Sequence, residues 1–115
     1  IERRRHRRKY AEGELPPEQS FYFRGPAGQL NLRAHNLLLF MQLGEGVDQA
    51  TWIHHLRSHD YSTWIKQVIK DEALAQRVRE VEQQANLPAE ESRQLIRSAI
   101  EERYTVPAGG DEHTS

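Results

Sequence analysis

The chain has 115 residues, 37% of them hydrophobic and 29% charged, and its formal net charge is -1 at pH 7. This length fits a single domain, and the mean hydropathy of -0.85 is low enough to predict polar tails beside it. The sequence contains neither an apolar run long enough for a membrane span nor a signal peptide. It also contains no Cys, which excludes disulfides, thiolate metal sites and cysteine nucleophiles. We expect a cytoplasmic domain that is monomeric in isolation.

Charge is distributed very unevenly along the chain. Residues 1–9 hold six cations and one anion and therefore carry +5, whereas the rest of the chain carries -6. The six cations are Arg3, Arg4, Arg5, Arg7, Arg8 and Lys9. Like charges packed together repel and stay solvated, which predicts a flexible basic arm and linker over 1–19. A helical domain over 20–107 and a disordered tail over 108–115 follow. Because the chain begins at Ile1 rather than Met, we expect that it was cut from a longer protein.

The aromatic triplet Phe21, Tyr22 and Phe23 lies in a stretch, residues 10–31, that shows no helical periodicity. No second segment of clear polar–apolar alternation is found nearby to pair with it. The triplet is therefore predicted to be an extended segment laid over the helices, with a short strand as the alternative.

The first helix is predicted over about residues 32–43. Asn31 can cap it through its side-chain oxygen, and Gly44 suits the left-handed conformation that ends helices. Its apolar residues surround the helix axis almost completely, which predicts that this helix is central and buried.

Four further helices are predicted by caps and apolar stripes. Asp48 caps a helix over about 49–58, Ser62 caps a short third helix, Asp71 caps a fourth, and Pro88 is the first residue of a fifth. Both tryptophans lie on apolar faces, so we expect them to pack in the core rather than to line a ligand groove. The predicted core consists of Leu37, Phe40, Trp52, Leu56, Trp64, Ile65, Val68, Leu74, Val78 and Leu95. The fold class is therefore predicted to be all-α, a compact bundle of about five short helices.

Motifs for chemistry are mostly absent. The glycines form no phosphate-binding loop, and the sequence contains no nucleophile elbow and no Asp-x-Asp pair. The acidic pairs on the last two predicted helices are typical of a solvated surface. An independent hydrolase would need an acid–base pair that this sequence does not show, so we predict no catalytic residue.

Histidines gather in one part of the chain. His55 and His59 are four residues apart, so on a continuous helix they share one face and can both bind a metal ion. However, His59 falls at the predicted helix end, and a third ligand would have to come from elsewhere. An imidazole near a helix C-terminus also complements the helix dipole. We therefore expect no metal and no other cofactor in this domain, with His55 and His59 as the candidates if one is bound.

The basic segment can contact nucleic-acid phosphates, yet no aromatic residue interleaves its arginines as a stacking platform requires. We interpret it as a solvated linker and do not expect nucleic acid as a partner. The alternative is that it docks on acidic faces, which would include Glu80, Glu82, Glu90 and Glu101. Arg24, Arg33 and Arg57 complete the candidate interaction surface, and for them anion binding and solubility both remain open.

One family resemblance spans residues 3 to about 107. The segments that carry it, in order, are 7–13, 21–26, 30–37, 46–48, 51–52, 55–57, 60–64, 69–71, 74–75 and 99–104. Together they resemble the C-terminal region of bacterial multidomain proteins that have an N-terminal haloacid-dehalogenase-like hydrolase domain and are labelled phosphoglycolate-phosphatase-like. The element Asp60-Tyr61-Ser62-x-Trp64 is also similar, more distantly, to small helical domains of sugar-active bacterial enzymes.

The resemblance implies a parent protein whose chemistry resides in its upstream domain, with an aspartate nucleophile and Mg²⁺. No catalytic residue carries over to this chain. The expected function is that of a non-catalytic accessory or regulatory C-terminal domain, which docks to other domains of its parent within or between molecules. The alternative is an anion- or nucleic-acid-binding helical module that uses the basic arm and the histidine cluster.

Overall fold

The structure is a computed structural model, and it describes residues 10–104. Its elements, in chain order, are the 3-10 turn η1 (Pro17–Gln19), strands β1 (Phe21–Phe23) and β2 (Leu32–Ala34), and helices α2 (Leu37–Gly46), α3 (Gln49–Arg57), α4 (Asp60–Trp64), the π-helical η2 (Ile65–Ile69), α5 (Glu72–Glu82) and α6 (Ala89–Tyr104). The prediction of a mostly helical domain is confirmed. The all-α class is wrong in one respect, because β1 and β2 form a small antiparallel sheet.

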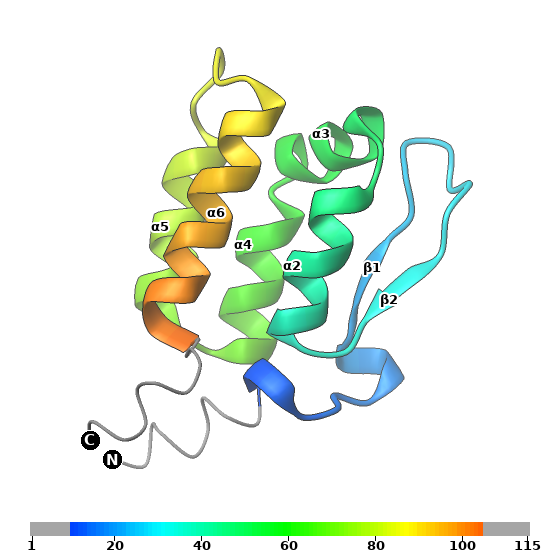
Figure 1. The fold of residues 1–115 in the computed structure, drawn as a ribbon, viewed down its shortest axis with the longest axis vertical. Coiled ribbons are helices and arrows are strands. Elements are labelled where there is room, and N and C mark those ends of the chain that lie inside the picture. The colour runs from blue at the N-terminus through cyan, green and yellow to red at the C-terminus, as the bar shows by residue number, and fades with distance from the viewer. Residues whose placement is uncertain (1–9, 105–115) are drawn as a thin grey trace.

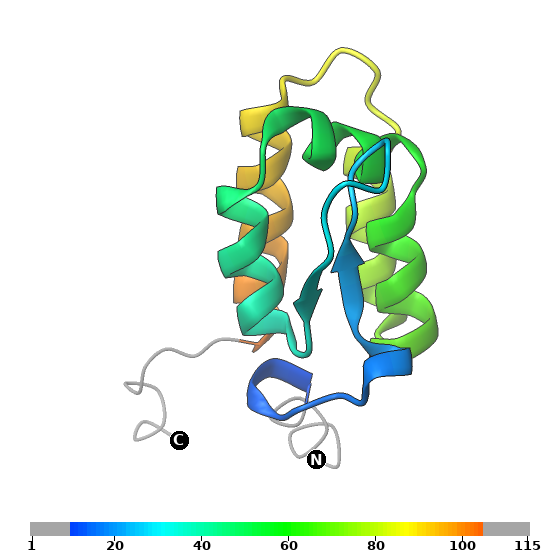
Figure 2. The same ribbon diagram turned by 90° about the vertical axis from the view of Figure 1, so that its right-hand side faces the viewer.

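The elements form three layers (Figures 1 and 2). Helices α5 and α6 pack against each other, α4 and α2 pack on them, and the β1–β2 hairpin lies across the outer side of α2 and α4. Helix α3 crosses one end of this arrangement. The beginning and the end of the described chain lie together at the other end. Residues 10–19 pack against the domain, and Leu15 is only 1% exposed.

The hairpin corrects the prediction for the aromatic triplet. Phe21 pairs with Ala34 and Phe23 with Leu32, so these residues are a strand rather than an unpaired extended segment. Successive side chains of a strand point to opposite faces, which buries Phe21 and Phe23 and leaves Tyr22 half-exposed. The partner strand was hidden in the sequence because it ends only two residues before a leucine-rich helix, so its residues looked like the start of that helix.

Helix α2 therefore begins later than predicted, at Leu37, and its N-cap is Asn36 rather than Asn31. The Asn36 side chain accepts a hydrogen bond from the Leu39 N–H at 2.7 Å and donates one to the Gly13 carbonyl at 2.8 Å. Gly44 does not end the helix, which continues to Gly46. Gly44 instead faces the Trp52 ring, where an added Cβ would lie 3.1 Å from a ring carbon, so it serves close packing.

The caps of α3 and α5 are as predicted. Asp48 accepts from the Thr51 N–H and Asp71 from the Leu74 N–H, which satisfies backbone donors in the first turn of each helix. The prediction for Ser62 is wrong, because α4 begins at Asp60 and Ser62 lies inside it. The residue before α4 is His59, in the left-handed conformation with φ 60°. Such a backbone is uncommon for residues other than Gly and cannot be recognised from helix-capping patterns.

The core is an aromatic cluster between the hairpin and the helices. The centroid of the Phe21 ring lies within 5.5 Å of the ring centroids of Phe23, Phe40 and Trp64, and all three pairs meet edge to face. Eight of the ten predicted core residues are buried. The other two predictions are wrong, because Val68 is only half-buried and Leu95 is 42% exposed on the outer side of α6.

Replacing Trp64 by Ala should cost roughly 3–5 kcal/mol of unfolding free energy, because the ring is buried and its removal leaves a cavity. The Trp64 Nε1–H also donates to the Gln19 carbonyl at 2.8 Å, and that acceptor would lose its partner. Leu95→Ala is the control and should cost less than about 1 kcal/mol, because the side chain is largely exposed. Urea denaturation of both variants measures the difference, and equal midpoints would contradict the placement of Trp64.

Candidate functional site

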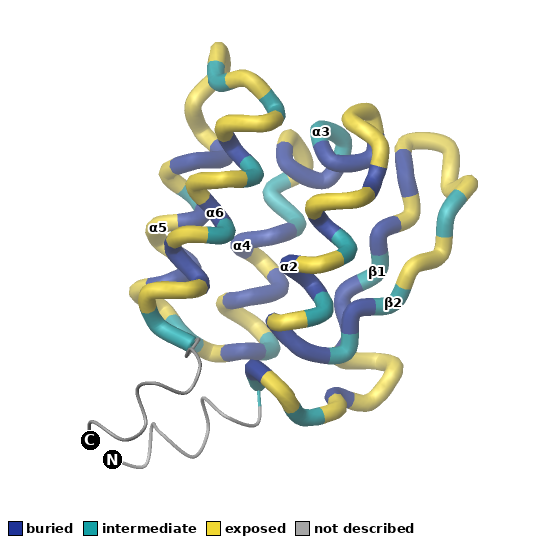
Figure 3. The backbone as a smooth tube through the Cα atoms, viewed as in Figure 1, coloured by how far each residue is buried: buried dark blue, intermediate teal, exposed yellow. Residues whose placement is uncertain are grey.

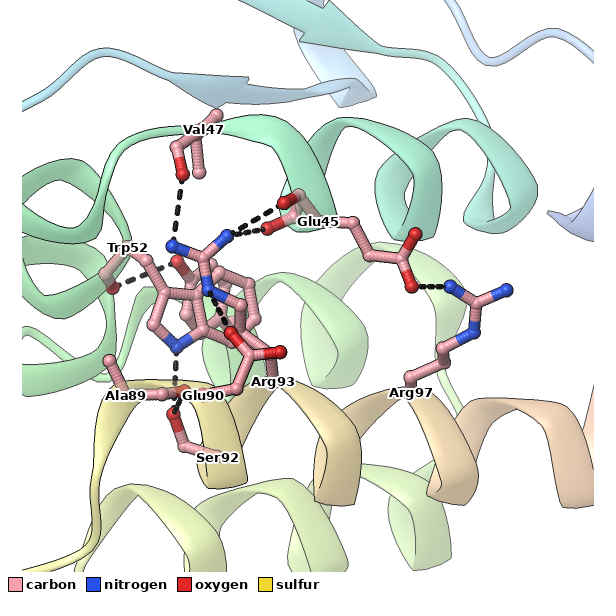
Figure 4. Close-up of polar contacts among 10 residues, drawn as sticks. Glu45, Val47, Trp52, Ala89, Glu90, Ser92, Arg93 and Arg97 are labelled. Atoms are coloured by element: carbon pink, nitrogen blue, oxygen red, sulfur yellow. Dashed lines mark hydrogen bonds and ion pairs between the residues drawn. The ribbon is translucent and has the colours of Figure 1, made fainter.

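The most concentrated polar contacts of the described chain surround Arg93 of α6 (Figure 4). Its guanidinium donates to the carbonyls of Gly44, Glu45 and Val47, at 2.6, 3.0 and 2.9 Å. The last carbonyls of a helix have no partner within the helix, so Arg93 caps the C-terminal end of α2 from a distant part of the chain. The side chain is only 11% exposed, and its Nε lies 3.9 Å from the Glu90 carboxylate.

The Arg93 guanidinium lies over the indole ring of Trp52 in α3. The guanidinium carbon lies 5.4 Å from the Trp52 ring centroid, and the indole N–H donates to the Ser92 hydroxyl at 2.8 Å. Arg97 forms an ion pair with Glu45 at the rim. The small hollow between these groups encloses about 10 Å³, roughly what one water molecule needs. The guanidinium N–H groups already donate to three carbonyls, and the hollow beside them is too small for an anion. Arg93 therefore acts as a helix cap rather than as an anion-binding residue.

A second cluster lies where α3 meets α4. The His55 ring is buried, and its Nε2 accepts a hydrogen bond from the Arg24 backbone N–H at 3.1 Å. The nitrogen that accepts carries no proton, so the proton is on Nδ1, which donates to Asp60 at 2.8 Å. A general base needs a free lone pair, and both nitrogens of His55 are engaged. The His55–Asp60 pair therefore joins the hairpin to the two helices.

The third cluster is a buried carboxylate. Glu82 of α5 accepts from the Ser62 backbone N–H at 3.0 Å and from the Ser62 hydroxyl at 2.6 Å. Burial raises the pKa of the Glu82 carboxyl above its usual range, against the opposing effect of the Ser62 hydrogen bonds and of the nearby His59 and Arg79. Glu82 thus caps α4 from inside the core. It is not part of an exposed acidic face, which corrects the alternative docking surface considered for the basic segment.

Burial also determines the protonation state of the hydroxyl of Tyr61, the residue between Asp60 and Ser62. It raises the pKa of the Tyr61 hydroxyl, which keeps its proton and donates it to the Trp52 carbonyl at 3.0 Å. The Tyr61 ring stacks on the Trp52 ring at 4.5 Å. Tyr61 therefore connects the Arg93 cluster with the His55 cluster.

The structure does not bring the predicted metal ligands together. His55 is occupied on both nitrogens, and His59 lies across the turn into α4. Within residues 10–104 no group of three His, Cys, Asp or Glu side chains is placed to hold a metal ion.

The predicted cationic surface separates into different roles. Arg33 is structural: it donates to the Ser20 hydroxyl and the Leu15 carbonyl at 2.9 and 2.7 Å. The Arg24 guanidinium lies over the Tyr22 ring and donates to Asn31. Arg57 is exposed at the end of α3. The six cations of the basic arm, Arg3, Arg4, Arg5, Arg7, Arg8 and Lys9, lie outside the described residues.

Sequence reasoning missed Arg93, Glu82 and Asp60 as organising residues. Each is polar in the sequence and looks like part of a solvated helix face. The partners of Glu82 and Arg93 are 20 and 49 residues away along the chain, so no local spacing signals these two contacts.

No helix between residues 10 and 104 is long and apolar enough to cross a membrane. No protein-family model, curated protein or solved structure matches the chain.

Replacing Arg93 by Met should cost about 3 kcal/mol of unfolding free energy, because the three carbonyls at the end of α2 lose a charged donor and two of them are partly buried. Arg97→Met is the matched control on the same helix and should cost less than about 1 kcal/mol, because exposed ion pairs contribute little. Urea denaturation followed by tryptophan fluorescence compares the two variants. Equal losses would show that Arg93 is not a cap.

The raised pKa of Glu82 predicts a pH dependence of stability. A carboxyl group whose pKa is higher in the folded than in the unfolded chain binds its proton more tightly when folded, so unfolding free energy falls as pH rises from its unfolded pKa through its folded pKa. Asp71 acts in the opposite direction: despite its burial, hydrogen bonds from Arg103, Leu74 and Tyr104 lower its pKa, so its contribution is lost as pH falls.

The difference between the wild type and Glu82→Gln isolates the Glu82 contribution, because the amide keeps the shape and can accept the Ser62 N–H. The stability of the wild type relative to the variant should decrease as pH rises, as measured by urea denaturation at a series of pH values. A difference that is constant with pH, or that increases, would contradict a raised pKa.

Zn²⁺ should not raise the melting temperature of the domain. A site with three ligands would stabilise the fold by mass action, and both nitrogens of His55 are already used. Thermal melts with Zn²⁺ and with EDTA test this, and an EDTA-reversible rise that is lost in His55→Ala or His59→Ala would refute it.

Proposed function

We propose that this chain is a non-catalytic accessory or regulatory domain of a bacterial phosphoglycolate-phosphatase-like hydrolase, and that it docks to the hydrolase part of that protein. The sequence resemblance described above supports the parent. The observation that carries the docking role is the solvent-exposed face of α2, formed by Leu38, Leu39, Gln42 and Leu43 and named here the α2 face.

The α2 face is apolar and uncharged. Leu38 is 46% exposed, and Leu39 and Leu43 are only partly buried, so three leucines of one helix reach the surface. The backbone of α2 carries exposed and intermediate segments along its length (Figure 3). Contiguous exposed apolar surface of this kind is typical of protein–protein contact sites. Leu95 on α6 differs, because its exposed neighbours on the helix are Glu91, Gln94 and Ser98.

The position of the α2 face also supports docking within one polypeptide. Helix α2 begins at the same end of the molecule at which the described chain begins and ends (Figure 1). Leu38 and Leu39 are in its first turn. A domain joined to the chain at this end would therefore be close to the two leucines that start the face.

The hydrogen bonds of the buried polar side chains support a non-catalytic role. Glu82, His55 and Arg93 are the groups that most resemble catalytic or anion-binding residues, and each is held by backbone groups of a distant element. The Mg²⁺ and the aspartate nucleophile that the resemblance implies would belong to the hydrolase domain. We place the protein in the cytoplasm, in keeping with its lack of Cys.

The coding sequence around this chain should specify a haloacid-dehalogenase-like domain. Titration of the ¹⁵N-labelled chain with that domain should shift amide signals of α2, and Leu38→Glu should weaken binding at least about tenfold, a loss of about 1.4 kcal/mol. Leu95→Glu is the control, since Leu95 lies two residues from Arg97 and so on the side of α6 that faces away from α2. Both variants should keep the melting temperature of the wild type, because both leucines are exposed.

Three results would overturn the proposal: no hydrolase domain in the coding sequence, no binding, or equal effects of the two substitutions. The chain by itself should hydrolyse neither phosphoglycolate nor p-nitrophenyl phosphate, with or without Mg²⁺. Turnover that co-purifies with the folded chain and responds to substitution of its residues would refute the non-catalytic role.

A further inference from the structure

The loop between β1 and β2, residues 24–31, is held to the rest of the protein by very few polar contacts. Its hydrogen bonds outside the strands are mostly internal: Gly28 N to Gly25 O, Leu30 N to Arg24 O, Ala27 N to Gln29 Oε1, and the Arg24 guanidinium to Asn31 Oδ1. Among the described residues, one hydrogen bond joins this loop to a helix, and it runs from the Arg24 backbone N–H to His55 Nε2 at 3.1 Å.

That hydrogen bond requires a neutral imidazole. Nε2 can accept the Arg24 N–H only while it carries no proton, and Nδ1 already donates to Asp60. The ring is 6% exposed, and its face and edges meet Phe21 and Phe23, with centroid distances of 5.4 and 6.0 Å. The ring therefore has little contact with solvent while the loop is in place.

We propose that the loop 24–31 is a pH-sensitive lid that closes only over neutral His55. When Nε2 takes up a proton, two N–H groups point at each other and the Arg24 hydrogen bond is lost. The loop then detaches at Arg24, and water reaches the charged ring. Buried charges are costly unless they are paired and hydrogen-bonded, which favours the open loop over a closed loop with a charged ring.

The other groups around His55 do not remove this coupling. Asp60 stabilises the protonated ring through Nδ1, but it can do so with the loop open or closed. The ring of His54, the neighbour on α3, lies 4.9 Å from the His55 ring between centroids. Tyr61 from α4 faces the ring as a neutral phenol, and β1 contributes Phe21 and Phe23. The Arg24 guanidinium lies on the Tyr22 ring.

Hydrogen exchange of the full chain tests the proposal. Histidine charge changes between about pH 8 and pH 5, and over this range the protection factor of the Arg24 amide should fall at least about tenfold. The ¹⁵N shifts of the His55 ring, recorded in the same samples, report whether Nε2 carries a proton. Amides inside α5 and α6 should keep their protection, because the opening is local.

Two variants distinguish opening caused by His55 from a nonspecific effect of low pH on the whole protein. In His55→Gln, the side-chain oxygen can accept the Arg24 N–H and does not titrate, so the protection factor should stay constant with pH. His54→Gln is the matched control on the same helix and should keep the tenfold fall. Asp60→Asn should move the opening to lower pH, because the protonated ring loses its countercharge, and this comparison holds even if His55→Gln does not fold.

Any of three results would overturn the lid. The first is a protonated His55 Nε2 with unchanged Arg24 protection. The second is an equal fall in His55→Gln, and the third is an opening that Asp60→Asn leaves at the same pH.

Discussion

The structure depends on one constraint: backbone groups are buried where the chain reverses direction, and each must find a hydrogen-bond partner. Helix α3 crosses one end of the domain. Arg93 satisfies the carbonyls at the end of α2, and Glu82 satisfies an N–H in the first turn of α4. His55 satisfies the N–H that follows β1. Each partner comes from an element that is distant in sequence.

This constraint explains the distribution of chemistry in the molecule. A guanidinium, a carboxylate and an imidazole are the usual components of catalytic and anion-binding sites, but here each is turned toward backbone. The loss of any one of these side chains would leave backbone groups of a distant element without their partner. What remains for contact with other molecules is surface, and the α2 face with its exposed Leu38 is an apolar part of it.

The amino-acid pattern determined the helices better than it determined their relations. Asp48 and Asp71 are strong N-caps whose effect is local, so α3 and α5 begin where predicted. The hairpin was missed because Phe21 and Phe23 become a strand only when a partner lies beside them, and the partner residues looked like the start of α2. Gly44 was interpreted as a helix stop, because its close approach to Trp52 is invisible in one dimension.

The sequence by itself determined a mostly helical domain, the position of most helices and most of the buried apolar residues, because these follow from periodicity and from caps that act within one turn. Only the tertiary structure decided which polar residues organise the fold. It placed Ser62 inside a helix that Glu82 caps, and it placed His55 between Arg24 and Asp60. The physical reason is that a side chain can satisfy a buried backbone group only where the folded chain brings the two together, and no local spacing encodes that meeting.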